Sequence, residues 1–267
     1  MGITRQMGAR RFGRWNWLGL YELARREVMR FLSVWTQTVL APLVTAGLFL
    51  AVFALAIGPS RGDVMGVPFL HFLAPGILTM TVIQNAFANA SSSLMVAKVQ
   101  GNIVDTLMPP LSAAELVIGY VTGAVARGVL VAVSTGIVMV VGLGVPLAHP
   151  FVALAFTILG AALLGGLGLI AAILAEKFDH MAAITNFIVT PLAFLSGTFY
   201  SIEGLPGWLQ AASHMNPVFY LIDGVRFGVI GVSDSSPALG FAVAAAATAA
   251  VLALSWYWFR TGYRLKA

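Results

Sequence analysis

The sequence predicts an all-α integral membrane protein whose chain crosses the membrane as six helices. Of its 267 residues, 59% are hydrophobic and only 9% are charged, whereas a soluble domain carries about 25% charged residues. The apolar runs are long and continuous, as spanning helices of about 20 residues require, and they lack the alternation of a membrane β-barrel. Six such spans leave little chain for a soluble domain, so residues 1–267 are expected to form one transmembrane domain.

A basic tail and an amphipathic helix are expected before the first span. Residues 15–32 read WNWLGLYELARREVMRFL, and their apolar members recur at helical spacing. We expect 1–33 to be a cytoplasmic tail followed by a helix that lies in the membrane interface, with a soluble helix as the alternative. The tail arginines are Arg5, Arg10, Arg11 and Arg14, and the apolar positions of the helix are Trp17, Leu20, Ala24, Val28 and Phe31.

The positions of lysine and arginine give the orientation of the spans. With a cytoplasmic N-terminus, nearly all of these residues fall on the cytoplasmic side, and the outer segments hold only Arg61 and Arg226. We therefore expect a multi-pass chain with both termini in the cytoplasm. The expected spans are about 35–57, 69–94, 116–143, 151–174, 182–200 and 238–259.

The segment 203–231, between the fifth and sixth expected spans, is apolar but interrupted. A surface loop would be polar, and a simple further span would not carry three charges around helix breakers. The sequence therefore predicts a re-entrant helical hairpin that enters the membrane from the outer face and returns to it. The breakers are Gly204, Pro206, Gly207 and Asn216-Pro217, and the charges are Glu203, Asp223 and Arg226, of which the last two are spaced to pair across a helical turn.

The cytoplasmic connection 97–115 is predicted to contain a short amphipathic helix. Ser112 and Glu115 form an S-x-x-E capping box that starts the third span after the Pro109-Pro110 break. Ahead of this break, apolar residues share one helical face, and such a face needs a partner. The residues are equally compatible with another protein and with the chain's own spans or lipid. The apolar residues are Ile103, Val104, Leu107 and Met108.

Together these segments resemble the membrane subunits of type-2 ABC exporters, which export drugs, lipo-oligosaccharides and polysaccharides. That family carries a P-x-x-F-L-S-G span, then L-P with an aromatic residue, then N-P followed by an aromatic residue and a D-x-x-R helix. The layout of interfacial helix, six spans and outer hairpin extends the resemblance over essentially the whole chain. The matching residues are Pro191, Phe194, Leu195, Ser196, Gly197, Leu205, Pro206, Trp208, Asn216, Pro217, Tyr220, Asp223 and Arg226.

The resemblance implies a role for each part and a set of partners. The helix in 97–115 would dock on an ABC ATPase subunit, and the outer hairpin would close the external end of the path. Two copies of the chain would pair with two ATPase copies in the bacterial inner membrane, in contact with lipid. The implied coupling residues are Asn102, Ile103, Asp105, Leu107 and Met108, and the implied hairpin residues are Pro206, Trp208, Asn216, Pro217, Asp223 and Arg226.

The chain is not expected to bind nucleotide or to act as an enzyme by itself. No G-x-x-x-x-G-K-[ST] phosphate loop occurs, and Lys98, Lys177 and Lys266 all lack the preceding glycine. ATP and magnesium would therefore bind to the partner. The four histidines fall in separate segments, so we expect no metal site. No catalytic residue is expected either. No nucleic-acid partner is expected, because the basic residues lie where a membrane topology would place them.

Polar and aromatic groups within the spans are candidates for the substrate path. Arg127 lies inside the third span, where a charge costs about 2.5–3.5 kcal/mol on insertion scales. It either faces an anionic substrate headgroup or snorkels to the inner interface. The other candidates are an amide stripe of Gln84, Asn85 and Asn89 and an aromatic gate of Phe194, Phe199 and Tyr200, and ordinary helix packing accounts for both sets equally well.

The expected lining is mostly aliphatic with some amides, which favours a hydrophobic drug, a lipid or a lipid-linked glycan as cargo. The alternative is an ion-coupled secondary transporter. Such a carrier needs acidic groups in the middle of the membrane, and none of the ten acids lies centrally in an expected span. The sequence also shows no internal repeat, which many secondary transporters have.

Overall fold

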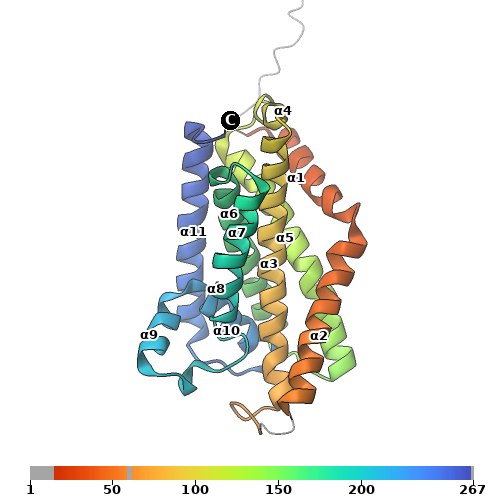
Figure 1. The fold of residues 1–267 in the computed structure, drawn as a ribbon, viewed down its shortest axis with the longest axis vertical. Helices are drawn as coiled ribbons and strands as arrows, with labels where there is room; N and C mark the ends of the chain where they lie inside the picture. Colours follow the sequence, from red (N-terminus) through yellow and green to blue (C-terminus); the bar gives the residue numbers. More distant parts are fainter. Residues whose placement is uncertain (1–14, 59–61, 266–267) are drawn as a thin grey trace, which may run out of the picture.

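The computed structural model describes residues 15–58 and 62–265, and its regular structure is helical. Among these residues the only β-type pairing is an isolated bridge between Val64 and Val67. Figure 1 shows most helices running along one long axis, with α4 and the end of α11 at one end and the end of α2 and the start of α3 at the other. We call these the α4 end and the α2–α3 end. The basic residues Arg5, Arg10, Arg11, Arg14, Arg61 and Lys266 lie outside the described residues.

Within the described residues, five helices are long and apolar enough to cross a membrane. They agree with five of the six expected spans, with small differences at their ends. They are Thr36–Ala56 (η1, Thr36–Leu40, and α2, Ala41–Ala56), α3 (Phe69–Val99), Ala113–Gly142 (α5, Ala113–Ile137, and η3, Val138–Gly142), α6 (Pro150–Leu174) and α11 (Pro237–Thr261).

The expected fifth span, 182–200, is a helical segment that starts earlier and ends earlier. It consists of α7 (Phe178–Ile184), η4 (Thr185–Val189) and α8 (Thr190–Phe194) in direct succession. From Leu195 the chain turns, and Gly197 has a φ of +76°. The turn packs so tightly on α3 that a Cβ at Gly76 would lie 2.3 Å from the Thr198 carbonyl oxygen. The helix thus ends at a turn that contains Ser196, Gly197 and Thr198 and lies directly against α3.

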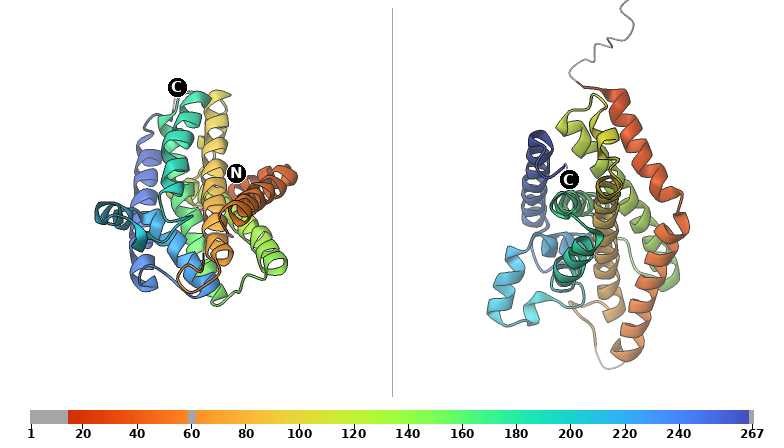
Figure 2. Two further views of the ribbon diagram at one scale, coloured as in Figure 1. Left: turned by 60° about the horizontal axis from the view of Figure 1, so that its bottom comes forward. Right: turned by 45° about the horizontal axis from the view of Figure 1, so that its top comes forward.

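The remaining helices are short and lie near the ends of the bundle. They are α1 (Trp17–Leu32), α4 (Ile103–Leu107), η5 (Ile202–Gly204), α9 (Gly207–Met215) and α10 (Pro217–Ile230). In both views of Figure 2, the chain from α1 to α2 runs along one side of the bundle and α9 protrudes on the opposite side. The predicted hairpin 203–231 is thus α9 and α10, joined at Asn216.

The helix α3 is the centre of the bundle. It packs against α6, α5, α10 and α2, and most of its residues are buried. By contrast α2 exposes large apolar side chains, including Leu48 at 64% and Leu55 at 80%. An apolar surface of this kind fits contact with lipid, because single-chain soluble proteins rarely leave large apolar patches uncovered.

The helix α1 belongs to the bundle because two glycines of α5 make room for it. A Cβ at Gly119 would lie 2.5 Å from Leu23 Cδ2, and one at Gly123 would lie 2.5 Å from Glu27 Cβ. Glycines four residues apart allow two helices to approach this closely. The buried face of α1 is therefore Leu23, Glu27 and Phe31. This face differs from the expected apolar stripe, and Trp17 is 70% exposed.

The contact between α1 and α5 predicts opposite effects for two matched substitutions on α5. A Gly123→Ala change should lower the free energy of unfolding by about 1–3 kcal/mol, because the new methyl group collides with the rigid Cβ of Glu27. A Gly136→Ala change should be neutral or stabilising by up to about 1 kcal/mol, since its Cβ would lie 3.7 Å from Leu78 Cδ1. Thermal unfolding in detergent measures both, and equal melting temperatures would contradict the predicted contact.

Candidate functional site

The segment between α3 and α5 ends in the capping box that the sequence predicts. The Ser112 Oγ accepts the backbone N–H of Glu115 at 3.3 Å, and the Glu115 carboxylate accepts the backbone N–H of Ser112 at 2.6 Å. Both bonds satisfy donors that a helix start leaves free. The capping box therefore stabilises the N-terminus of α5, with which the third expected span begins.

The Glu115 carboxylate also fastens the start of α1, which the sequence did not indicate. Its second oxygen accepts the backbone N–H of Asn16. The Asn16 side chain caps α1 by accepting the Gly19 N–H at 3.0 Å and donates to the Pro110 carbonyl at 3.2 Å. The beginning of α1, the end of the 97–115 segment and the beginning of α5 are thus joined in one hydrogen-bonded unit.

The carboxylate of Glu27 is completely buried between α1 and α3. It accepts from Arg26 at 3.1 Å, from Arg30 at 3.2 Å and from the Ser93 hydroxyl at 2.8 Å. A buried charge is tolerated when it is paired and hydrogen-bonded in this way. The Glu27 carboxylate therefore holds the side chains of Arg26 and Arg30 close to α3 and α5.

The two arginines extend these contacts to three other helices. Arg26 donates to Thr106 on α4 and to the Tyr120 hydroxyl on α5, both at 3.4 Å. Arg30 donates to the side-chain oxygen of Asn89 on α3 at 3.0 Å and to its carbonyl at 2.7 Å. The helix α1 is thereby connected to α3, α4 and α5 at once.

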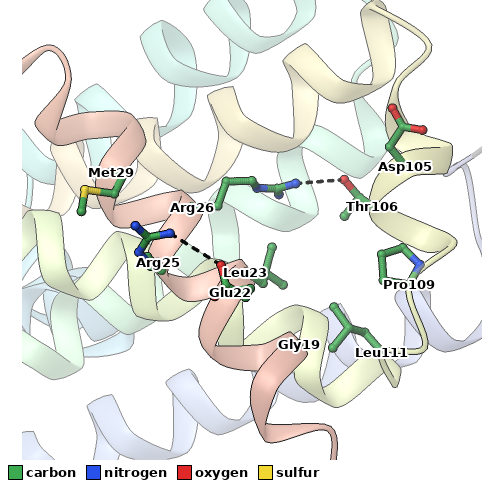
Figure 3. A pocket seen from close by; sticks show the side chains of 10 residues that line it. All are labelled: Gly19, Glu22, Leu23, Arg25, Arg26, Met29, Asp105, Thr106, Pro109 and Leu111. Atoms are coloured by element: carbon green, nitrogen blue, oxygen red, sulfur yellow. Dashed lines mark hydrogen bonds and ion pairs between the residues drawn. The ribbon is translucent and has the colours of Figure 1, made fainter. Parts of the chain in front are cut away.

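A groove of about 490 Å³ separates α1 from α4 (Figure 3). Arg26 spans it to reach Thr106, while Glu22 pairs with Arg25 at 3.7 Å at the exposed rim. The groove combines apolar walls with charges of both signs, which suits contact with a protein surface. Its remaining lining residues are Gly19, Leu23, Met29, Asp105, Pro109 and Leu111.

The predicted coupling residues divide into an inner and an outer set on α4. Ile103 is buried and Leu107 is half-buried against the core, so these two hold the helix in place. Met108 is 76% exposed, and the neighbouring Val104 is 50% exposed. Asn102 and Asp105 are also exposed. The apolar outer residues have no cover within the described chain.

The hairpin is organised around the Asn216-Pro217 pair. The Asn216 side chain caps α10 by accepting the Val218 N–H at 3.0 Å and donates to the Ser196 hydroxyl at 2.7 Å. Pro217 occupies the first turn of α10, where its missing N–H costs nothing. In α9, which Pro206 precedes, the Trp208 side chain is 72% exposed. The hairpin thus pairs an exposed helix with a buried one.

Arg226 is fully buried at the centre of the hairpin and makes the predicted pair with Asp223 at 3.7 Å. It also lies 3.4 Å from Asp234, donates to the Gly197 carbonyl at 2.5 Å and stacks 4.2 Å from the ring centre of Phe72 on α3. The Asp223 carboxylate in turn accepts the Asp234 backbone N–H at 2.7 Å. One guanidinium therefore holds α10, the turn after α8, the 233–235 turn and α3 together.

The candidate path residues of α3 take part in contacts between helices. Asn89 is fully buried on Arg30, and Asn85 accepts from Arg127 at 3.0 Å. Gln84 is half-buried. Arg127 thus has an amide partner inside the span, which the sequence did not indicate. Their role in a substrate path remains a prediction.

The candidate aromatic gate packs within the chain. Phe194 and Phe199 lie 5.2 Å apart between ring centres, and Phe199 stacks on Phe53 of α2 at 4.8 Å. The Tyr200 hydroxyl donates to the Leu195 carbonyl at 2.9 Å. These contacts connect the turn after α8 to α2. The gating role of the three aromatic residues stays a prediction.

The Arg226 network predicts a large effect for Arg226→Met. Removing the guanidinium leaves two buried carboxylates without their cation, which should lower the free energy of unfolding by about 3–5 kcal/mol. The matched change Arg260→Met, at an exposed arginine near the end of α11, should cost less than about 1 kcal/mol. Thermal unfolding of both variants in detergent checks the difference, and similar losses would argue against the network.

Comparison with known proteins places this architecture in a family. Residues 19–230 match the family model described as ABC-2 type transporter. The chain is 35% identical over 254 residues to the inner membrane transport permease YadH of Escherichia coli (strain K12), across 94% of this chain and 98% of that protein. It is also 24% identical over 222 residues to nodulation protein J of Rhizobium meliloti (strain 1021), across 81% and 82% of the two chains.

These matches confirm the family resemblance that the sequence motifs indicated. The permeases of this family carry no nucleotide site and work with an ABC ATPase subunit, and the relative YadH is an inner membrane protein. The contacts of α1, α4, α9 and α10 described above all lie in or close to the matched region. The chain belongs to the ABC-2 type transporter family and is a membrane permease subunit.

Proposed function

We propose that two copies of the chain form the membrane path of an exporter and that two copies of a separate ATPase drive it. The observation that carries this proposal is the exposure of Val104 and Met108 on α4, a helix that Ile103 and Leu107 hold from the other side. ATP and magnesium bind to the partner, and α4 receives the movement of that partner. The chain itself supplies the path and its selectivity.

The contacts behind α4 support its role in coupling. Arg26 joins α4 to α1 and α5, and Asn16 joins the end of the 97–115 segment to the same two helices. A displacement of α4 therefore moves the ends of α1 and α5 with it. The groove between α1 and α4 lies beside the exposed residues of α4 and enlarges the surface available to the partner.

We further propose that α7, η4 and α8 together form the fifth span in chain order, which brings the number of spans to six. They have seven, five and five residues in direct succession. At 1.5 Å per residue this segment is roughly 25 Å long, close to the thickness of the hydrocarbon core. Its apolar surface, with Phe187 at 81% exposure, also fits a membrane environment. With six spans, both termini lie in the cytoplasm and the α9–α10 hairpin is re-entrant from the outer face.

The cargo that fits this chain is a hydrophobic drug, a lipid or a lipid-linked glycan. The uncovered face of α3 carries the half-buried amides Gln84 and Asn85 beside the exposed Ala88. Phe194 and Phe199 are occupied by each other and by α2, so they offer no free platform for stacking sugar rings. An amphipathic molecule suits such a surface better than a polysaccharide.

Purification of the chain from its host, followed by identification of the bound proteins, tests the function. We expect a stoichiometric ABC ATPase, and vanadate-sensitive, ATP-dependent transport after reconstitution of both subunits. Transport by the chain alone, driven by an ion gradient and insensitive to vanadate, would instead establish the ion-coupled carrier.

The proposed docking surface predicts that Met108→Asp weakens ATPase binding by about thirtyfold. A buried interface anchor is worth roughly 2 kcal/mol or more, and a charge at its place loses that energy. The control is Met215→Asp, because Met215 is 86% exposed on α9, away from α4. Affinity measured by surface binding of the purified ATPase should change for the first variant alone. Unchanged affinity for Met108→Asp would exclude α4 as the docking helix.

The proposed orientation predicts opposite labelling of two introduced cysteines. The chain has no cysteine, so each single variant reports one position. A membrane-impermeant maleimide should label Met108→Cys only from the cytoplasmic side and Met215→Cys only from the outer side. Inside-out and right-side-out vesicles give the two conditions, and labelling of both positions from one side would refute the proposed topology.

A further inference from the structure

Two arginines and two amides meet between α1 and the membrane-spanning helices α3 and α5. Arg127 donates to the Asn85 side-chain oxygen at 3.0 Å, and Arg30 donates to the Asn89 side-chain oxygen at 3.0 Å. Asn85 and Asn89 are four residues apart on α3, so they lie on one face about one helical turn apart. We call these four residues the arginine–amide cluster.

The arginine–amide cluster has more hydrogen-bond donors than acceptors. Of the five buried side-chain atoms without a partner in the described part of the chain, three belong to it, namely Arg30 Nε, Arg127 Nε and Asn89 Nδ2. All three are donors. Buried polar groups are normally satisfied, and an arginine offers five N–H groups and no acceptor. A group rich in acceptor oxygens would satisfy all three donors.

The charge balance points to the same kind of group. Glu27 is shared between Arg26 and Arg30, and within 15–58 and 62–265 no ion pair is formed by Arg127. Asp105, on α4, lines the adjoining groove and is exposed there. The cluster and its neighbours thus retain a positive excess at the depth of Arg127. Phosphate oxygens would supply both the acceptors and the negative charge.

The cluster can be reached from the α4 end and from the open face of α3. A groove of about 420 Å³ between α1, α3 and α4 borders Arg30, whose side chain is 35% exposed. On α3 the exposed Ala88 and the half-buried Ser92 continue this face beside Asn85. Arg127 lies near the middle of the span Ala113–Gly142. A free anion would have to leave water to reach that depth, whereas a lipid headgroup is carried there by its own chains.

We propose that Arg30 and Arg127, held by Asn89 and Asn85, bind the phosphate headgroup of a lipid that enters from the cytoplasmic leaflet. The proposal rests on the proposed function, because it makes the cluster a cargo site on the export path. The ligand class is an anionic phospholipid or a lipid-linked phosphate. Neutral amphiphiles lack the charge that the two guanidinium groups require.

Native mass spectrometry of the full chain with its copurified ATPase tests this site. Phosphatidic acid, phosphatidylcholine with the same acyl chains, and inorganic phosphate serve as probes. We expect phosphatidic acid to bind at least about tenfold more tightly than phosphatidylcholine, and Arg127→Gln to remove about a tenfold preference. Arg260→Gln, at an exposed arginine near the end of α11, should leave the preference unchanged. Arg127→Lys, which keeps the charge, should retain most of it.

Three outcomes would overturn the proposal. They are equal binding of the two lipids to the native chain, an undiminished preference in Arg127→Gln, and displacement of phosphatidic acid by millimolar inorganic phosphate, which would identify a free anion as the ligand. If Arg127→Gln does not fold, the lipid comparison on the native chain and on Arg127→Lys still decides. ATP-dependent transport by the same preparations reports on the exporter separately, so lipid selectivity can fail while the proposed function stands.

Discussion

The buried carboxylate of Glu27 is the interaction on which the α4 end of the protein depends. A carboxylate without exposure costs several kcal/mol unless it is paired, and here Arg26, Arg30 and Ser93 supply that pairing. Both arginines lie on the same helix as Glu27, so they are drawn inward together, and each brings a further contact to α3, α4 or α5. The room for this arrangement comes from Gly123, which lets the backbone of α1 approach α5. The helix that the sequence predicts to lie in the membrane interface is thereby also fixed to the bundle.

A second buried charge network closes the other half of the molecule, and α3 connects the two. Arg226 rests on Phe72 near the start of α3, and Arg30 binds Asn89 in its second half. The intervening residues form one continuous, mostly buried helix. The helix α3 therefore contacts both networks, and Pro75, which cannot donate a backbone hydrogen bond, lies between the two contact points.

Local patterns in the sequence predicted much of this fold, because the forces behind them act over a few residues. Apolar runs gave five spans, Ser112 and Glu115 gave a helix start, and the three-residue spacing of Asp223 and Arg226 gave an ion pair. The contacts that assemble the candidate site escaped prediction, since they depend on how each helix is rotated about its axis. Asn16 and Glu115 are far apart in sequence, and α1 exposes Trp17 because Glu27 is turned inward. The end of the fifth span was also missed, because the close packing of the turn after α8 against Gly76 of α3 is a contact between segments far apart in sequence.

The partners of the cations held within the bundle separate positions that the chain itself completes from a position that suits another molecule. Lys98, near the end of α3, donates to the carbonyls of Ala172, Ile173 and Ala175 at 2.9, 2.8 and 2.7 Å. All three of its donors are used, and its charge lies at the C-terminal end of α6, where the helix dipole favours a cation. Arg127 makes one bond to an amide and leaves its Nε unpaired. Both residues are held within the same bundle, so the difference does not come from burial alone. Arg226 also leaves its Nε unpaired, but Asp223 and Asp234 balance its charge. Arg127 has no such carboxylate among the described residues, and the proposed phosphate would take that place.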